Sequence, residues 1–497
     1  MHALIKLFFI LFFLLTYVVS SAQSKNDYVW LTGRGSKKNI LDFNSGSVII
    51  TESELSLGIM GDNASYCDDN GNLICYSNGF AIANANHEIF MNGDSLSSDD
   101  KFFLNGNLSE NGRIGVQDLL ILPEPFSDST FYIIHKPRFF NDENDLKAGY
   151  LLYSFLDLNA NSGQGEVIEK NIEFFFDEYL LGSYLTAIHH ANAEDWWIID
   201  LKETENEYFT FLLDSTGISL IHSQEIGGDR FYDAASSGTA KFSSDGTKYC
   251  HFNYGDQLWI YDFDRETGLL SNADEIIIND TLPQVFSSVE WSANSRFIYV
   301  ACKFYLYQID TWNNNEVELI SEWSGLSDPF ANTYWLMVQG PDCRIYLRST
   351  NGTDSWHVIH YPDEKGQECG FQEASVRPPN GGTFGNWPNH PRWRVDEEEK
   401  CDPSIISMLG QPVYYVEQIK IYPNPAQNFI KLELPSIGKG EIEIYNTNGQ
   451  LKEKRKWDST NNETISLLHF PSGMYFLEFI PLDNPKRKVY QGKIIKQ

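Results

Sequence analysis

The chain is poor in positive charge and in long apolar segments. Its 497 residues include 37 Lys and Arg against 68 Asp and Glu, which gives a net charge of −31 at pH 7. A surface this acidic repels a phosphate backbone, so the composition predicts no nucleic-acid partner. After the first 22 residues no segment is long and apolar enough to cross a bilayer, so we expect no membrane span in the mature protein.

Two common catalytic motifs are also missing. The sequence contains no His-Glu-x-x-His pattern for zinc and no Gly-x-Ser-x-Gly nucleophile elbow. Sustained helical periodicity is absent too, which disfavours α/β folds. Aromatic residues make up 14% of the chain, and large rings pack well on pleated surfaces. The sequence therefore predicts an all-β protein.

The first 22 residues have the pattern of a signal peptide. Lys6 precedes an apolar run of about 13 residues, which suits a signal peptide and is short for a membrane span. Small residues at Ser20 and Ala22 place a cleavage site between Ala22 and Gln23. No cysteine follows the run closely, so a lipid-modified N-terminal cysteine is not expected.

Residues 23–395 contain a repeat of about 50 residues. Segments 67–75, 242–250, 291–299 and 339–347 each read as a strand, a polar turn and a second strand, and segments 126–134 and 191–199 fit the second half of this unit. A third strand usually follows, as in segments 150–158, 258–268 and 305–312. Aligned second strands recur at steps of 58, 65, 52, 49 and 48 residues, with these residues in one column: Cys75, Ile133, Ile198, Cys250, Tyr299 and Leu347.

Short strands at this spacing are typical of WD-like β-propeller blades. Segment 40–46 resembles the end of a third strand but has no strand–turn–strand unit before it. We therefore predict seven blades, with six or eight as alternatives. In this interpretation the segment around 384–395 begins a composite blade that the N-terminal strands complete, which removes free sheet edges.

Residues 418–497 form a separate unit with a different charge. From Glu417 onward there are 12 Lys and Arg and 9 Asp and Glu, a net of +3, which leaves about −34 on the rest. Alternating strands and the turn signal Asn448-Gly449 predict a small β-sandwich. Pro423 and Pro425 cannot donate to a sheet ladder and so mark a corner between strands. Residues 396–417 read as a linker.

The motifs of this unit resemble a known family. The segments IKIYPNPAQNFIKLEL, IEIYNTNGQLK and FPSGMYFLEF and the basic ending GKIIKQ resemble the type A C-terminal sorting domain of type IX secretion cargo in the Bacteroidetes. The residues that match its motifs are Tyr422, Pro423, Asn424, Pro425, Asn448, Gly449 and Gly473.

The resemblance implies export through the periplasm by the type IX machinery, ending in release or display on the outer surface. Attachment to surface lipopolysaccharide after removal of the domain is implied as well. The body, with segments such as DDNGNLICYSNG and NWPNHPRWRV, resembles the uncharacterised propellers that carry this domain. That likeness supplies no catalytic residues.

Seven cysteines leave at least one thiol unpaired. Cys75 and Cys250 share a repeat position with Ile and Leu and are expected to be small buried residues. A bridge between Cys67 and Cys75 is geometrically possible. A bridge between Cys369 and Cys401 would pin the linker to the propeller, and Cys343 is the competing partner for it.

Other polar and aromatic candidates favour structural roles. His189 and His190 are adjacent on a strand, so they point to opposite faces and cannot easily share a metal. The acidic runs at Asp68-Asp69-Asn70 and 396–399 offer oxygen ligands for calcium but lack the EF-hand pattern. No other cofactor is expected. Trp196, Trp197, Trp387 and Trp393 could stack on sugars, but core packing is the favoured interpretation.

Two function classes remain open. The favoured hypothesis is an exported binding or adhesion protein without catalysis, whose glycan or protein ligand the sequence does not identify. The alternative is an extracellular hydrolase or lyase that acts on polysaccharide or peptide in the propeller funnel. Such an enzyme needs carboxylates or metal ligands that converge from several blades.

Overall fold

The computed structural model describes most of the chain. The described residues are 23–35, 37–97, 112–113, 115–140, 146–203, 206–228, 238–253, 257–278, 286–327, 329–349, 351–379, 381, 385–402, 405, 416–418, 420–433, 439–446, 450–457, 464–481 and 489–497. Within them, no helix is long and apolar enough to cross a membrane.

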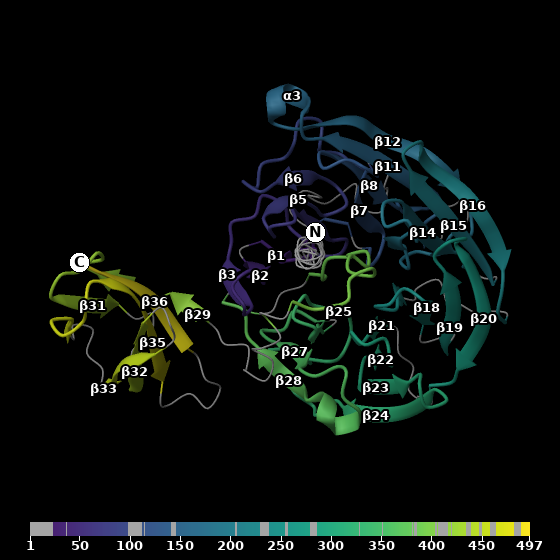
Figure 1. The fold of residues 1–497 in the computed structure, drawn as a ribbon. Helices are drawn as coiled ribbons and strands as arrows, with labels where there is room; N and C mark the ends of the chain where they lie inside the picture. Colours follow the sequence, from purple (N-terminus) through teal and green to yellow (C-terminus); the bar gives the residue numbers. More distant parts are fainter. Residues whose placement is uncertain are drawn as a thin grey trace, which may run out of the picture.

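Seven antiparallel sheets stand side by side in a ring, as Figure 1 shows. Among the described residues, the first two blades have three strands each: β1 (Val29–Arg34), β2 (Lys37–Asp42) and β3 (Ile49–Glu52), then β4 (Ala64–Cys67), β5 (Leu73–Ser77) and β6 (Ile82–Asn84). The third blade consists of β7 (Leu119–Pro123), β8 (Thr130–His135), β11 (Tyr150–Asp157) and β12 (Glu166–Phe176). The short pair β9 (Phe139–Phe140) and β10 (Leu146–Lys147) and the helical turn α3 (Ala160–Gly163) lie in its connections.

The remaining four blades have four strands each in sequence order. Blade four is β13 (Thr186–His189), β14 (Trp196–Leu201), β15 (Glu207–Asp214) and β16 (Gly217–Glu225). Blade five is β17 (Thr239–Phe242), β18 (Lys248–Asn253), β19 (Gln257–Asp264) and β20 (Leu269–Ile276). Blade six is β21 (Ser287–Trp291), β22 (Phe297–Cys302), β23 (Tyr305–Asp310) and β24 (Glu316–Glu322). Blade seven is β25 (Met337–Gln339), β26 (Ile345–Leu347), β27 (Trp356–Ile359) and β28 (Phe371–Val376), with the 3-10 turn η2 (Gly366–Cys369) before its last strand.

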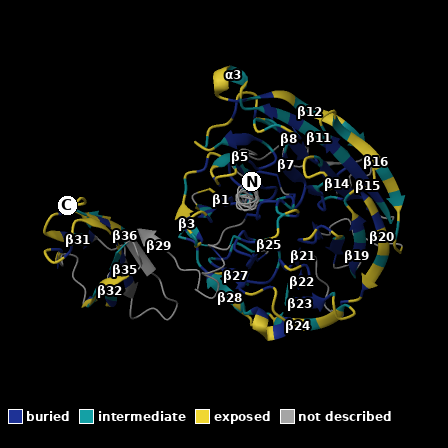
Figure 2. Ribbon diagram, in the orientation of Figure 1, coloured by how far each residue is buried: buried dark blue, intermediate teal, exposed yellow. Residues whose placement is uncertain are grey.

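The predicted propeller fold and its seven blades are confirmed. Every residue of the predicted repeat column lies in the second strand of its blade, from Cys75 in β5 to Leu347 in β26. The repeat was visible because each blade rebuilds the same hairpin, with apolar side chains on both faces of its inner strands. Figure 2 shows this gradient, with buried inner strands and partly exposed outermost strands such as β12, β16 and β20.

Apolar cores fill the spaces between neighbouring blades. One such core joins blade seven to blade one, where Trp387 packs on Trp30 and Trp356 with ring centroids 5.6 and 4.8 Å apart. Burial of large rings is among the strongest apolar contributions to folding. The ring is therefore closed by packing between the first and last blades.

The predicted composite blade is wrong in one respect. Residues 385–391 form no strand although Asn386 and Trp387 contact β1, and among the described residues the first sheet contains only β1, β2 and β3. Pro388 and Pro391 carry no backbone N–H and so cannot support a ladder. Instead, the Thr32 hydroxyl donates to the Asn386 carbonyl at 3.3 Å.

The end of the chain forms two further sheets. The larger is β29 (Val416–Gln418), β36 (Val489–Lys496), β35 (Gly473–Pro481), β32 (Gly440–Asn446) and β33 (Leu451–Trp457), in that order. The smaller is β30 (Lys420–Tyr422), β31 (Phe429–Glu433) and β34 (Thr464–Ser466). They share an apolar core that includes Ile442, Trp457 and Leu477. This agrees with the predicted β-sandwich.

The predicted linker boundaries differ from the structure. Asp396 forms an ion pair of 2.7 Å with Arg265, and Tyr28 donates a hydrogen bond of 2.7 Å to Asp402. Residues 396–402 therefore belong to the propeller, because their side chains pair with blade residues far away in sequence. At the other end, Val416 already begins a sandwich strand.

Candidate functional site

The centre of the ring, where a propeller enzyme would bind its substrate, contains a segment of the chain itself. Residues 385–395 contact the inner strands of several blades. The amide of Asn389 donates to the Leu119 carbonyl at 3.0 Å and to the Leu185 carbonyl at 2.9 Å, and it accepts from Gln117 at 3.2 Å. A buried side-chain amide can satisfy several groups at once, so Asn389 ties blades three and four to the segment.

Arg392 extends the same segment toward blades five, six and seven. Its guanidinium donates to the Phe242 carbonyl at 2.8 Å, to the Gln339 side chain at 3.3 Å and to the Glu290 carboxylate. Glu290 is buried and also lies 3.5 Å from the Lys241 ammonium. Burial alone would raise the pKa of Glu290, but Arg392 and Lys241 together hold it below its usual value.

Arg394 completes the segment by binding the N-terminal end of the fold. It donates to both carboxylate oxygens of Asp27, at 2.6 and 2.7 Å. Burial opposes ionisation of Asp27, but Arg394 outweighs it and keeps the pKa of Asp27 below the usual value. Asp27 and Glu290 are thus both held as carboxylates by an arginine. A glycosidase needs one carboxyl group with a raised pKa to act as the acid, which neither of these supplies.

Small cavities border this segment. A cavity of about 40 Å³ lies among Asp27, Lys241, Glu290, His390 and Arg392. That volume holds only a few water molecules. Burial lowers the pKa of His390 to about 4, so its ring is neutral at pH 7. This cavity has room for water molecules only.

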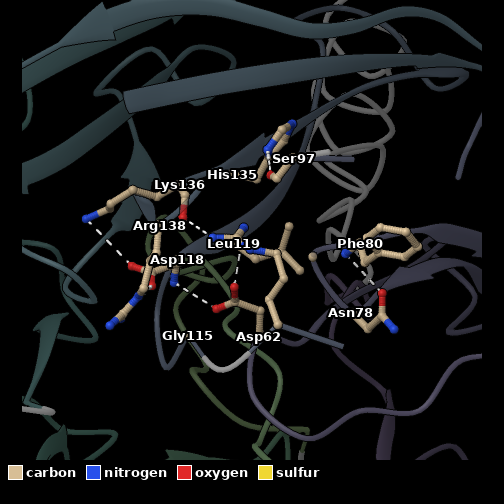
Figure 3. A network of polar contacts seen from close by, with 12 residues as sticks. Asp62, Asn78, Phe80, Ser97, Gly115, Asp118, Leu119, His135, Lys136 and Arg138 are labelled. Atoms are coloured by element: carbon tan, nitrogen blue, oxygen red, sulfur yellow. Dashed lines mark hydrogen bonds and ion pairs between the residues drawn. The ribbon is translucent and has the colours of Figure 1, made fainter. Parts of the chain in front are cut away.

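A second polar cluster joins blades two, three and four close to this segment, and Figure 3 shows it. Lys136 pairs with Asp200 at 2.7 Å and lies 3.8 Å from Asp118, while Arg138 pairs with Asp118 at 2.8 Å. Asp62 accepts from the Asp118 N–H at 3.2 Å and lies 3.5 Å from Arg113. Together these six charged groups connect the three blades at one place.

The carboxyl groups of this cluster differ in acidity. Burial raises the pKa of Asp62 to about 7 against the effect of Arg113, and it raises the pKa of Asp200 to about 6 against Lys136. For Asp118 burial acts in the same direction, but Arg138, Lys136 and Arg113 outweigh it and lower the pKa. Gly115 approaches so closely that a Cβ there would lie 2.0 Å from an Asp62 oxygen. The cluster is tightly packed rather than open to a ligand.

The two candidate histidines lie on opposite sides of blade four, as predicted. His189 stacks on Trp196 with ring centroids 3.7 Å apart, and burial lowers its pKa to about 4. His190 lies 5.3 Å from Trp197 and accepts a hydrogen bond of 3.0 Å from the Asn192 N–H. Each ring serves a local packing or turn role.

The four candidate tryptophans are core residues, as favoured above. Trp196, Trp197, Trp387 and Trp393 are between 0 and 8% exposed. Since their faces are covered by other side chains, none of the four can stack on a sugar.

The cysteines pair differently from the favoured prediction. Cys401 forms a disulfide with Cys343, the competing partner, and Cys369 is a buried free thiol. The pairing follows from packing, because Cys343 and Cys401 meet beside Ala293 whereas Cys369 lies in the core between blades six and seven. Cys67, Cys75 and Cys250 are also buried free thiols, so the possible bridge between Cys67 and Cys75 is not formed.

The acidic runs are occupied by the protein's own donors. The Asp68 carboxylate accepts from the N–H groups of Asn70 and Asn72 at 2.9 and 2.8 Å, which stabilises the turn. Glu397 accepts from the Ser24 N–H at 2.8 Å. No group of three or more His, Cys, Asp or Glu suited to a metal occurs among the described residues. Calcium binding stays a prediction.

The sorting-domain motif has a clear local geometry. The Asn424 amide donates to the Lys493 carbonyl at 2.6 Å and accepts from the Ile495 N–H at 2.8 Å. Its side chain thus pairs with strand β36 as another strand would. Tyr422 ends β30, and Pro423 and Pro425 turn the chain toward β31, so the predicted corner is present.

The other predicted site residues are distributed as follows. Gly473 begins β35 and pairs with Lys496. Asn448 and Gly449, between β32 and β33, lie outside the described residues, and so does Ala22 at the predicted cleavage site. Gln23 is described, and its side chain donates to the Glu399 carbonyl at 3.0 Å.

The comparison with known families agrees with this geometry. The family described as "Secretion system C-terminal sorting domain" matches residues 420–497. No curated protein sequence shows a match to this chain.

Solved structures that resemble the chain are distant in sequence. They include a candidate 6-phosphogluconolactonase from Bacteroides uniformis (TM-score 0.43, 9% identity, 72% of this chain and 98% of that one) and AztD from Citrobacter koseri (0.34, 10%, 72% and 96%). A third is a gluconolactonase from Xanthomonas campestris (0.27, 9%, 67% and 90%). Similarity at this level carries no argument about activity.

Residues 420–497 are therefore a secretion sorting domain, and the chain is a cargo protein of the type IX secretion system. The domain directs the protein to the cell surface or to the medium. It implies an interaction with the type IX machinery.

Proposed function

We propose that this cargo protein is a non-catalytic binding or adhesion module, displayed on or released from the cell surface. The observation that carries the proposal is the occupied channel. Residues 385–395 occupy it, Arg392 and Arg394 bind its carboxylates, and the cavities beside them measure about 40 and 10 Å³. Ligands would then bind on the outer loops, where binding residues on a rigid scaffold are most often found.

The alternative of a hydrolase or lyase in the funnel has less support. It would require the segment to leave the channel, which breaks the arginine–carboxylate pairs and exposes Trp387 and Trp393. Removing one partner from a buried ion pair costs about 3–5 kcal/mol. Two such pairs would have to break each time the channel opened for a catalytic cycle, which makes this alternative energetically unfavourable.

The export route that we propose has three steps. The predicted signal peptide, residues 1–22, is removed between Ala22 and Gln23 during entry into the periplasm. The sorting domain then directs the folded propeller through the outer membrane. Removal of that domain, with attachment to lipopolysaccharide, would complete display. Sequencing of the mature N-terminus tests the first step, which predicts Gln23 as the first residue.

Thermal unfolding against a ligand panel tests the binding role. The panel contains glycans, peptides and divalent cations, added to the chain without its predicted signal peptide, residues 23–497. A ligand at 100 times its dissociation constant adds about 2.7 kcal/mol to the free energy of unfolding, which raises the midpoint measurably. We expect at least one ligand to raise the unfolding midpoint until binding saturates. Chromatography should then recover that ligand chemically unchanged. Conversion of that ligand into products would instead favour the hydrolase or lyase.

A further inference from the structure

We propose that Trp312 forms a stacking site for a pyranose saccharide on the turn between β23 and β24. The proposal rests on the binding role proposed above and names its ligand class. Trp312 is 69% exposed. Every other described tryptophan is buried or half-buried, and the four first considered for this role are in the core.

A comparison between blades shows that the fold does not require a tryptophan here. In each of five blades an aspartate at the end of the next-to-last strand accepts a hydrogen bond from the N–H two residues later. The pairs are Asp42 with Asn44, Asp157 with Asn159, Asp214 with Thr216, Asp264 with Glu266 and Asp310 with Trp312. The residues that donate this N–H in the other four blades are exposed and polar. The same turn therefore forms with Asn, Thr or Glu, and the tryptophan needs another explanation.

The turn around Trp312 is held in place by its neighbours. Arg296 binds Asp310 through two hydrogen bonds of 2.9 and 2.7 Å. The Arg296 carbonyl accepts from the Thr311 N–H and hydroxyl at 3.0 and 2.8 Å. The guanidinium carbon of Arg296 lies 5.5 Å from the Trp312 ring centroid, which holds the ring by a cation–π contact. A ring that is already ordered loses little entropy when a ligand binds.

The chemistry around the ring suits a saccharide. A pyranose presents an apolar C–H face, which stacks on an aromatic ring, and a rim of hydroxyl groups that require donors and acceptors. Beside Trp312, the Asn313 amide donates to Glu316 at 2.7 Å, and Lys365 pairs with Glu316 at 2.6 Å. These amide, carboxylate and ammonium groups are exposed and can exchange partners with hydroxyls.

The size of the Trp312 indole also favours a small ligand unit. A tryptophan contributes at most about 250 Å² of contact area. A standard protein interface buries about 800 Å² on each partner, with several aromatic anchors at its centre. One ring amid polar groups is closer to the dimensions of a sugar than to those of a protein surface.

The test compares three forms of the chain without its predicted signal peptide, residues 23–497. Trp312→Thr introduces the residue that the equivalent turn of blade four carries, so the fold should tolerate it. Phe126→Ser removes a different exposed ring, 72% exposed, from a turn of blade three and serves as the matched control. Calorimetric titration uses mannohexaose, xylohexaose, cellohexaose and laminarihexaose, and the delipidated O-polysaccharide of the host. The neutral oligosaccharides represent environmental glycans, and the O-polysaccharide represents the cell's own envelope.

We expect at least one saccharide to bind the unchanged protein and Phe126→Ser equally. Trp312→Thr should bind it at least about tenfold more weakly, as is typical when a central tryptophan is lost, with its melting temperature unchanged within about 2 °C. Equal binding by Trp312→Thr, or equal loss in both variants, would overturn the proposed site. Binding of peptides or proteins but no saccharide would overturn it while the binding role stands. A protein that binds no ligand of any class contradicts both.

Discussion

Arg394 holds the carboxylate of Asp27 through two hydrogen bonds, at 2.6 and 2.7 Å, across 367 positions of the sequence. This pair fixes the end of the propeller to its beginning. It stands beside the disulfide and the Tyr28–Asp402 hydrogen bond, so three different interactions close the ring in one place. No strand is exchanged to achieve this closure among the described residues.

Breaking the pair should destabilise the propeller. Asp27→Asn leaves the largely buried Arg394 without its counter-charge, and we expect a loss of about 3 kcal/mol in the free energy of unfolding. Because the pKa of Asp27 is lowered in the folded state, the contribution is present above about pH 4 and is lost as the pH falls. Urea denaturation at pH 7 and at about pH 2 measures both effects.

The matched control for this substitution is Asp354→Asn. Asp354 pairs with Lys37 at 3.5 Å, but both side chains are at least one third exposed. Surface pairs contribute little, so its removal should change stability by less than about 0.5 kcal/mol. Equal effects of the two substitutions would contradict the assigned role of Asp27.

The disulfide should stabilise the propeller about as much as the Asp27–Arg394 ion pair does. It links residues 58 positions apart, for which chain entropy gives about 4 kcal/mol, and Cys401→Ser should lose about 2–4 kcal/mol in the oxidised protein. Non-reducing peptide mapping should find the peptide of Cys343 joined to that of Cys401. A peptide that joins Cys369 to Cys401 would contradict the structure, and Cys369→Ala is the control that leaves the bridge intact.

The buried cluster around Asp62 predicts that folding stability changes with pH in the opposite direction to the contribution of Asp27. The pKa of Asp62 is raised to about 7, so the folded state favours its protonated form. That contribution is complete below about pH 4 and is lost as the pH rises through 7. Asp62→Asn does not titrate, so its stability relative to the unchanged protein should rise by about 2 kcal/mol between pH 5 and 8. Urea denaturation of the unchanged protein, Asp62→Asn and the exposed control Asp69→Asn across this pH range tests the prediction. If the free energy of unfolding follows the same pH dependence in all three proteins, the prediction is wrong.

The sorting motif allows a test within one short segment. Asn424→Ala removes both hydrogen bonds to β36, and we expect a loss of about 1–2 kcal/mol in sandwich stability. Faster hydrogen exchange at the Ile495 amide should accompany it, together with less protein outside the cell. Asn428→Ala, four residues along the same motif, is the control. If the two variants show the same hydrogen exchange at Ile495 and the same amount of exported protein, the hydrogen bonds of Asn424 contribute neither to stability nor to export.

Much of the fold could be predicted because it repeats. Alternating apolar residues and polar turns identify the second strand of blades from Cys75 to Leu347, and the prolines at 423 and 425 identify a corner in the sandwich. The path of residues 385–395 could not be derived, since Asn389 and Arg392 bond to carbonyls of strands far away in sequence. The only local signal was a strand-like segment interrupted by Pro388 and Pro391.

The candidate sites show the same limit. Sequence spacing placed His189 and His190 on opposite faces correctly, because that depends on strand geometry alone. It did not select Cys343 as the partner of Cys401. That pairing depends on how the segment at Cys401 packs against Cys343 and Ala293. Trp312 was overlooked because its turn resembled the others, and only its exposure distinguishes it from core tryptophans.

The most direct test of the account is export without the sorting domain. The chain is expressed in a Bacteroidetes host in complete form and with residues 420–497 deleted, each with the same internal tag. We predict that the complete protein reaches the surface or medium, whereas the shortened protein stays folded in the periplasm and retains its disulfide. Equal amounts of the two proteins outside the cell would contradict the central claim that this domain determines where the propeller acts.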